Sequence, residues 1–100
     1  MLESVAGLVR RQRPDLIINI AHMELAEPSI QQGIALCADE GASEIVVHPY
    51  MLSPGRHATD DIPNMVKTAS REYPDITFRV TDPLGVHDKI GEVILERAEL

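Results

Sequence analysis

The sequence contains few of the residues on which several classes of protein depend. Cys37 is the only cysteine in 100 residues, which excludes an intrachain disulfide, a zinc knuckle and a four-thiolate iron–sulfur site. No apolar run approaches the roughly 20 residues of a membrane span. The first residues also lack the basic segment and apolar run of a signal peptide. We therefore expect a cytoplasmic protein whose single thiol lies buried on a helix.

Aromatic and basic residues are scarce as well. Aromatic side chains make up 3% of the chain, so its core must be built from aliphatic residues. Nine basic residues face 16 acidic ones, and the net charge of −7 argues against nucleic acid or an anionic membrane as partner. The glycines stand singly, without a glycine-rich phosphate loop, and no Ser-His-Asp or Cys-His set is apparent. These absences weigh against nucleotide-dependent and acyl-transfer enzymes.

The hydrophobic pattern predicts an α/β domain over residues 1–100. Short β-branched runs predict strands at residues 16–21, 45–47 and 76–80. Apolar residues at helical spacing predict helices before, between and after these strands. Such alternation is typical of a parallel sheet with right-handed crossovers. Because three parallel strands make a small sheet to cover on both faces, the pattern indicates that a strand is missing or is supplied by a partner.

Local signals predict where the helices begin and end. Pro28 fits the first turn of the second helix, and Gly41 fits its C-terminal end. Pro63 is tolerated in a first turn, so we expect the third helix to be capped at or near Asp61. The last helix is expected to face the core through its apolar residues, which are Val86, Ile90, Val93 and Ile94.

Polar residues gather in the three loops that follow the predicted strands. Since the carboxyl ends of parallel strands meet at one edge of a sheet, these loops are expected to converge there. They carry His22, Glu24, Glu27, His48, Arg56, His57, Asp82 and His87. Imidazole and carboxylate together suit Fe, Co, Ni or Zn. No HExxH pattern is present, so each histidine could equally have a surface or structural role.

The stretch from Ser53 to His57 is the most informative of these loops. Gly55 permits a sharp turn, which would bring His57 close to a ligand at the start of a helix. A helix start disfavours an imidazolium and so keeps this histidine able to bind metal. The guanidinium of Arg56 could bind a substrate carboxylate, or could pair with an acidic residue of the following turn.

Four segments together resemble the small sirohydrochlorin chelatases, the class II tetrapyrrole metal chelatases. The segments are residues 24–29 (ELAEPS), 45–49 (IVVHP), 52–63 (LSPGRH followed by DIP) and 83–87 (PLGVH). The resemblance implies a flavodoxin-like sheet with metal and macrocycle at the strand ends. It implies a lyase that inserts Co²⁺ or Fe²⁺ into sirohydrochlorin for cobalamin or siroheme, with no permanently bound cofactor. Small chelatases of this kind often pair, so a homodimer is expected.

The resemblance also implies roles for individual residues. His57 matches a metal-binding, proton-accepting histidine, and Glu24 matches an acidic residue that faces the metal. Ser53, Gly55 and Arg56 match the part of the loop that holds the acetate and propionate groups of the macrocycle.

The chain departs from that family at its first residues. Family members begin with a strand ending in His-Gly-Ser, whose histidine is the other metal ligand, and that strand lies between the first two strands expected here. The sequence starts within what would be the first helix, which indicates an N-terminally truncated domain with a gap in its sheet. The alternatives are a non-catalytic tetrapyrrole- or metal-binding module and an inactive fragment. His22 and His48 are candidate substitute ligands.

Overall fold

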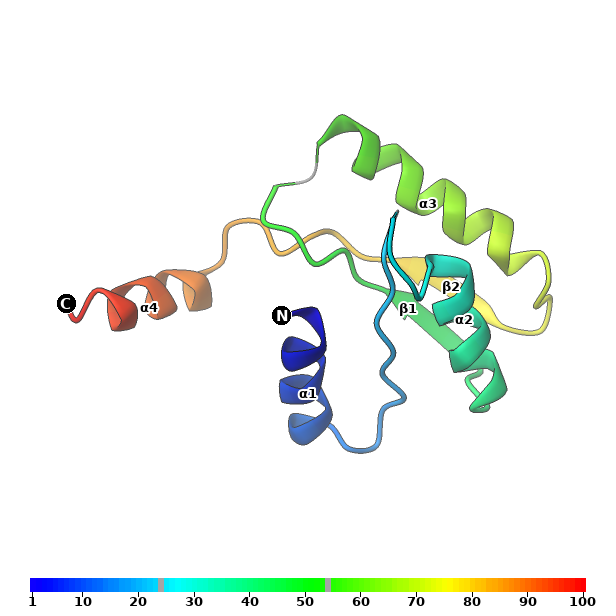
Figure 1. Cartoon of the computed structure of the whole chain (residues 1–100), viewed down its shortest axis with the longest axis horizontal. Coiled ribbons are helices and arrows are strands. Elements are labelled where there is room, and N and C mark those ends of the chain that lie inside the picture. The colour runs from blue at the N-terminus through cyan, green and yellow to red at the C-terminus, as the bar shows by residue number, and fades with distance from the viewer. Residues whose placement is uncertain (24, 54) are drawn as a thin grey trace.

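The computed structural model describes residues 1–23, 25–53 and 55–100, without the side chains of residues 56–58. Figure 1 shows helices and strands alternating along much of the chain. The α/β class predicted from the sequence is therefore confirmed. The elements are α1 (Leu2–Gln12), α2 (Ile30–Asp39), β1 (Glu44–Val47), α3 (Arg56–Ser70), β2 (Thr77–Val80) and α4 (Asp88–Arg97).

The sheet consists of β1 and β2, which pair in parallel. The backbone N–H of Thr77 donates to the carbonyl of Ser43 (3.2 Å), and that of Thr81 donates to the carbonyl of Val47 (2.9 Å). Backbone groups alternate in direction along a parallel strand, so the N–H and C=O of Val46 point to the other edge of β1. Within the described residues, no strand pairs with that edge.

The strand predicted at residues 16–21 does not form, and the prediction of a third strand is wrong. The nearest bridge is an isolated one between His22 and Ser29. The carbonyl of Ile18 instead accepts hydrogen bonds from the guanidinium of Arg10, the shorter at 2.8 Å. β-Branched residues favour an extended backbone, but a strand also needs a neighbour to complete its hydrogen bonds. No such neighbour lies beside this segment in the described structure.

The core lies between the sheet and the two helices that cover one of its faces. The buried side chains of α2 and α3 pack against that of Ile45 on β1. Figure 1 shows α3 running along β2, and α2 overlapping the β1–β2 pair in this view. The cluster consists of Ile30, Ile34, Ile45, Ile62, Val66 and Ala69.

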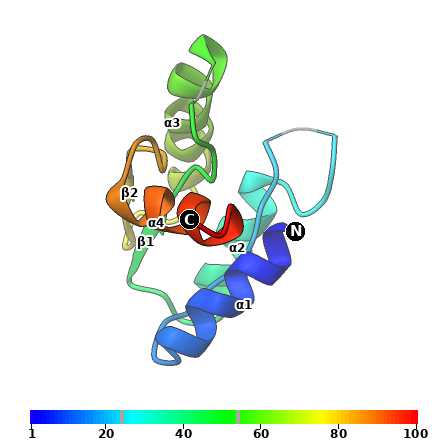
Figure 2. The ribbon, with the colours of Figure 1, turned by 90° about the vertical axis from the view of Figure 1, so that its left-hand side faces the viewer.

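The other two helices contribute little to this core. Ala6 is the buried residue of α1, and α4 has none. Ile94 is 61% exposed, and Val86 is fully exposed. Figure 1 shows α4 at one end of the molecule, away from α2 and α3, and Figure 2 views the molecule from that end, with α4 in front. The prediction that Val86, Ile90, Val93 and Ile94 face the core from the last helix is therefore wrong: Val86 precedes α4, and none of the four belongs to the described core.

The start of α3 also differs from the prediction. The helix begins at Arg56 with Gly55 as its N-cap, more than a turn before Asp61. Pro63 therefore lies inside the helix, where it cannot donate a hydrogen bond to the carbonyl of Thr59. Residues 56–62 contain no glycine or proline, so the loss of one hydrogen bond is tolerated and the helix continues through it.

α2 begins at Ile30, two residues after Pro28, which was predicted to lie in its first turn, and it ends before Gly41 as predicted. Ser29 is the N-cap, and its side chain and that of Gln32 form a reciprocal capping box (3.1 and 2.7 Å). Pro28 thus precedes the cap instead of lying in the first turn. Gly41 follows the helix with φ of 95°, a conformation that glycine adopts readily. Among the described residues, no helix is long and apolar enough to cross a membrane.

Candidate functional site

Two of the three loops expected to converge are joined at the ends of the strands. The Nδ1 atom of His48 lies 2.8 Å from the hydroxyl oxygen of Thr81. Farther along, the backbone N–H of Leu84 donates to the carbonyl of Met51 (3.1 Å). The loop after β1 and the loop after β2 therefore lie side by side, as the parallel topology predicted.

The third loop, residues 22–29, is closed on itself. The backbone N–H of His22 donates to the carbonyl of Pro28 (2.7 Å), so the loop leaves and returns at nearly the same place. The loop ends at the capping box of Ser29, which fixes the direction in which α2 leaves. The side chain of Met23 packs against the core and anchors the first part of the loop.

The two residues predicted to bind metal lie outside what the structure describes. Glu24 is not described, and neither are the side chains of His57 and Arg56. Their roles therefore stay predictions. The backbone places residue 57 in the first turn of α3, after the exposed Ser53 and Gly55, whereas the sequence prediction placed it in the loop before the helix.

The other histidines do not gather into a site. His87 caps α4, where its Nδ1 accepts a hydrogen bond from the backbone N–H of Lys89 (3.0 Å). His48 is bonded to Thr81, and His22 lies half-buried at the start of its loop. In the part of the chain that the structure describes, no three His, Cys, Asp or Glu side chains lie close enough to hold a metal. The described residues thus provide structural roles for His48 and His87.

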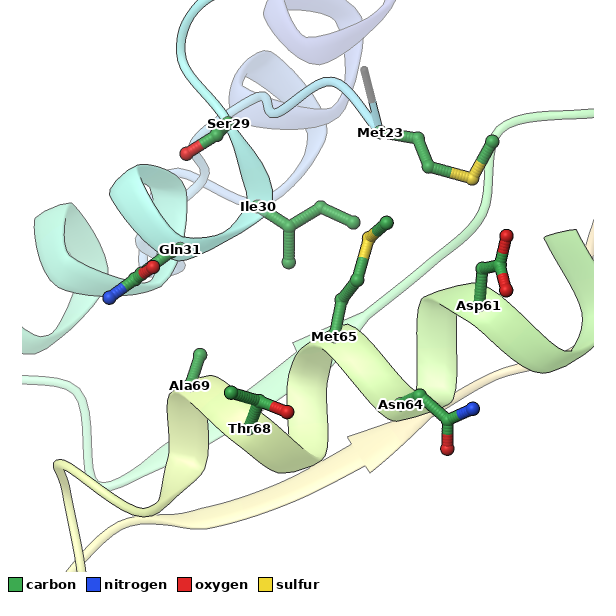
Figure 3. Close-up of a pocket in the computed structure, with 9 residues that line it drawn as sticks. All are labelled: Met23, Ser29, Ile30, Gln31, Asp61, Asn64, Met65, Thr68 and Ala69. Atoms are coloured by element: carbon green, nitrogen blue, oxygen red, sulfur yellow. The ribbon is translucent and has the colours of Figure 1, made fainter.

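A pocket of about 380 Å³ lies between the loop of residues 22–29, α2 and α3. The buried side chains of Ile30 and Ala69 belong to its wall, and Figure 3 shows the side chain of Met65 extending from α3 toward the loop that carries Met23. Along α3, Asp61, Asn64, Met65 and Thr68 also line it.

This pocket was not predicted, although the sequence contains a signal for it. Positions 57, 61, 64 and 68 recur at the spacing of one helical face, so the pocket-lining residues of α3 continue the face on which residue 57 lies. Met23, on the other side, immediately precedes Glu24. The described residues of the pocket thus come from the loop of residues 22–29, from α2 and from α3, which are far apart in the sequence.

Comparison with known proteins identifies the family. The family model of CbiX matches residues 1–99. The chain belongs to the CbiX family. Among curated CbiX relatives, the chloroplastic sirohydrochlorin ferrochelatase of Arabidopsis thaliana is 39% identical over 99% of this chain and 44% of its own length. The sirohydrochlorin cobaltochelatase of Priestia megaterium is 32% identical over 84% of this chain and 28% of its own. The chain thus spans less than half the length of these two relatives.

Solved CbiX-family structures share the fold. A CbiX protein from Marinobacter aquaeolei, described as a putative cobalamin biosynthesis protein, aligns with a TM-score of 0.72 at 28% identity, over 96% of this chain and 81% of that one. The sirohydrochlorin chelatase SirB of Bacillus subtilis subspecies spizizenii, solved in complex with cobalt, aligns with a TM-score of 0.77 at 26% identity, over 98% of this chain and 43% of its own. The predicted likeness to the small chelatases is confirmed.

Proposed function

We propose that this chain carries the activity of a sirohydrochlorin chelatase, the insertion of Co²⁺ or Fe²⁺ into sirohydrochlorin. The observation that carries the proposal is the match of the CbiX family model to residues 1–99, together with relatives named for this reaction. Relatives named ferrochelatase and cobaltochelatase both match, so the proposal includes both metals. The metal is a substrate that the protein transfers, and no resident cofactor is needed.

Metal insertion requires groups that accept the two pyrrole protons displaced by the ion. We assign this work to His57 and Glu24. A neutral imidazole can act both as a base and as a transient metal ligand near neutral pH. The position of residue 57 in the first turn of α3 supports a neutral ring, because the positive end of the helix dipole disfavours an imidazolium. The carboxylate of Glu24 would offset the charge of the ion.

The carboxylates of the macrocycle need partners in an acidic protein. We assign these to Arg56, Ser53 and the start of α3. The N-cap of α3 is Gly55, which has no side chain to bond the first N–H groups of the helix. A helix start of this kind favours a bound carboxylate through its N–H groups and its dipole. Ser53 lies two residues before this N-cap and is exposed, so it is accessible to the same ligand.

The homodimer and the cytoplasmic location stay predictions. Large apolar side chains are exposed on α4, including Leu95 at 52%, and they would suit a second copy of the chain. The relative from Arabidopsis is described as chloroplastic, so the compartment differs among members of the family.

The direct experiment follows the absorption spectrum of sirohydrochlorin with Co²⁺ or Fe²⁺ in the absence of oxygen. The purified chain should accelerate the spectral change of metal insertion above the rate without protein. The same chain with EDTA provides the control for the metal. If the rate equals that of the protein-free reaction for both metals, the proposed activity is contradicted.

A second candidate is a tetrapyrrole-binding module without turnover. The observation that favours it is the incomplete packing around the sheet, where one edge of β1 is unpaired in the described structure and α4 buries no side chain. Thermal unfolding distinguishes this candidate. A midpoint raised by sirohydrochlorin in a chain that does not accelerate insertion would favour the module, because a ligand stabilises the state that binds it. A chain without any cooperative transition would favour an inactive fragment.

A further inference from the structure

Residues 16–21 have the composition of a strand but no neighbouring strand among the described residues. The segment, Leu-Ile-Ile-Asn-Ile-Ala, contains no charge, glycine or proline. Ile17 is 40% exposed, and the backbone N–H groups of Ile17 and Ile20 have no acceptor in the described structure. Uncharged segments of this length that are rich in β-branched residues tend to pair between chains. The fold therefore needs a means of preventing this segment from self-associating.

Two contacts fix the segment against α2. The side-chain amide of Asn19 donates to the Sγ of Cys37 (3.2 Å). Gly33 allows Ala21 to lie close to the helix, since a Cβ at Gly33 would be 3.0 Å from that of Ala21. Figure 1 shows the segment as an extended stretch between α1 and the loop of residues 22–29. A strand from another chain would therefore meet a backbone that is already extended and held in place.

The side chain of Arg10 binds the segment from α1. Its guanidinium donates to the carbonyl of Ile18 through Nη2 (2.8 Å) and Nε (3.3 Å). The Nη1 atom of the same group forms an ion pair with the carboxylate of Glu3. Glu3 and Arg10 lie seven positions apart on α1, a spacing that places both on one face of the helix. The carboxylate thus holds the guanidinium over the backbone of the segment.

The contact with Arg10 lies on one particular edge of the segment. Alternate residues of an extended chain direct their N–H and C=O groups to the same edge, so Ile18, Ile20 and His22 share an edge. At one end of this edge, the N–H of His22 donates to the carbonyl of Pro28 (2.7 Å). At the other end, Arg10 occupies the carbonyl of Ile18. A strand could pair along this edge only if Arg10 released that carbonyl.

We propose that Arg10 is an edge-blocking residue that prevents residues 16–21 from pairing with the same edge of a second copy of the chain. Its guanidinium, held by Glu3, takes the place of a neighbouring strand at Ile18. A side chain can do this without extending the sheet, because it offers no further backbone groups to another chain. Natural sequences place charged residues beside uncharged strands for the same purpose. The inference does not depend on the proposed function, because it concerns the backbone of residues 16–21 and not a ligand.

The test compares Arg10→Met with Arg11→Met by sedimentation velocity over a range of protein concentrations. Methionine suits a helix and keeps much of the length of arginine, but it cannot donate to the carbonyl of Ile18. Arg11 is the matched control, since it lies in the same last turn of α1, is exposed and makes no hydrogen bond or ion pair in the described structure. Arg10→Met should self-associate at concentrations about tenfold lower than the unsubstituted chain, the usual order for losing a charge-assisted hydrogen bond. Arg11→Met should behave as the unsubstituted chain does.

Amide hydrogen exchange locates the new contact. In assembled Arg10→Met, the N–H groups of Ile18 and Ile20 should become protected, because they point to the unblocked edge. The N–H of Ile17 points to the opposite edge and should still exchange rapidly. Adding Ile17→Asp to Arg10→Met should reverse the self-association, since aspartate disfavours strand pairing and residue 17 is exposed. General misfolding would not be reversed by this second change.

A milder variant tests the same contact without removing the guanidinium. Glu3→Gln removes the charge that holds Arg10, and Glu3 is exposed, so the helices should be retained, as circular dichroism would show. Its self-association should begin at a lower concentration than that of the unsubstituted chain. Unchanged assembly of Glu3→Gln would contradict the part assigned to Glu3.

Two results would overturn the inference as a whole. If Arg10→Met self-associates no more readily than Arg11→Met, the guanidinium blocks no edge. If Arg10→Met loses its fold without pairing through residues 16–21, Arg10 is a structural tether and not a block.

Discussion

The imidazole of His48 and the hydroxyl of Thr81 lie 2.8 Å apart (Nδ1 to Oγ1) across the ends of β1 and β2. This contact extends the ladder of the sheet by one side-chain hydrogen bond beyond the last paired residues, Val47 and Val80. It brings the loop that leads to residue 57 beside the loop that follows β2. His48, whose role as a candidate ligand stays a prediction, uses its Nδ1 for this contact.

We expect Thr81→Val to destabilise the chain because it removes the partner of His48 and the hydroxyl that donates to the carbonyl of Asp82 (3.1 Å). The loss in free energy of unfolding should be about 1–3 kcal/mol, the usual contribution of two hydrogen bonds. Urea unfolding followed by circular dichroism measures it. Thr77→Val is the control, since this exposed residue of β2 makes no side-chain hydrogen bond in the described structure. Equal effects of the two changes would contradict the role of the contact.

Two glycines in helices predict opposite effects of the same substitution. A Cβ at Gly33 would lie 3.0 Å from the Cβ of Ala21 and 3.4 Å from the carbonyl oxygen of Ile20, whereas a Cβ at Gly91 would meet nothing within 4 Å. Gly91→Ala should therefore stabilise α4, by up to about 1 kcal/mol. In Gly33→Ala the same gain in helix propensity is opposed by crowding against residues 20–21.

The comparison is made by urea unfolding of the two variants side by side. Gly91→Ala should shift the midpoint upward, and Gly33→Ala should shift it downward. If Gly33→Ala is as stabilising as Gly91→Ala, α2 is not packed against the segment of residues 20–21.

Amide hydrogen exchange should distinguish the β1–β2 sheet from residues 16–21, which were predicted to form a strand and do not. The N–H groups of Thr77 and Thr81 are bonded to β1, so they should exchange slowly. Those of Ile17 and Ile20 have no hydrogen-bond acceptor in the described structure, and they should exchange at nearly the rate of an unfolded chain. Exchange measured residue by residue with NMR tests this. Strong protection at residues 17–20 would indicate that this segment pairs with a strand in solution.

Much of the fold could be predicted from the sequence because local signals decide it. The apolar spacing placed every helix, and the runs ending at Val47 and Val80 gave the two strands that form. The prediction of a strand at residues 16–21 was wrong because a strand also needs a neighbouring strand, which a local sequence pattern does not show. α3 begins earlier than predicted because the helix continues through Pro63 with the loss of one backbone hydrogen bond.

The site could be predicted only in part for a related reason. The loop leading to residue 57 could be recognised because its Pro-Gly turn and helix start are contiguous. The pocket could not, because Met23 and Met65 line the same space only when the loop of residues 22–29 packs near α3. The hydrogen bond between His48 and Thr81 likewise depends on the pairing of β1 with β2, and α3 lies between these two strands in the sequence.

The central claim, that residue 57 serves metal insertion, is tested most directly by comparing His57→Asn with His87→Asn. Asparagine is a good N-cap, so His87→Asn should preserve the start of α4. The initial rate of insertion into sirohydrochlorin is followed by absorbance with Co²⁺ and, without oxygen, with Fe²⁺. We predict that His57→Asn lowers the rate at least about 100-fold, the contribution of a general base, while His87→Asn changes it less than about twofold, since exposed sites away from the chemistry have small effects. An undiminished rate in His57→Asn would contradict the account.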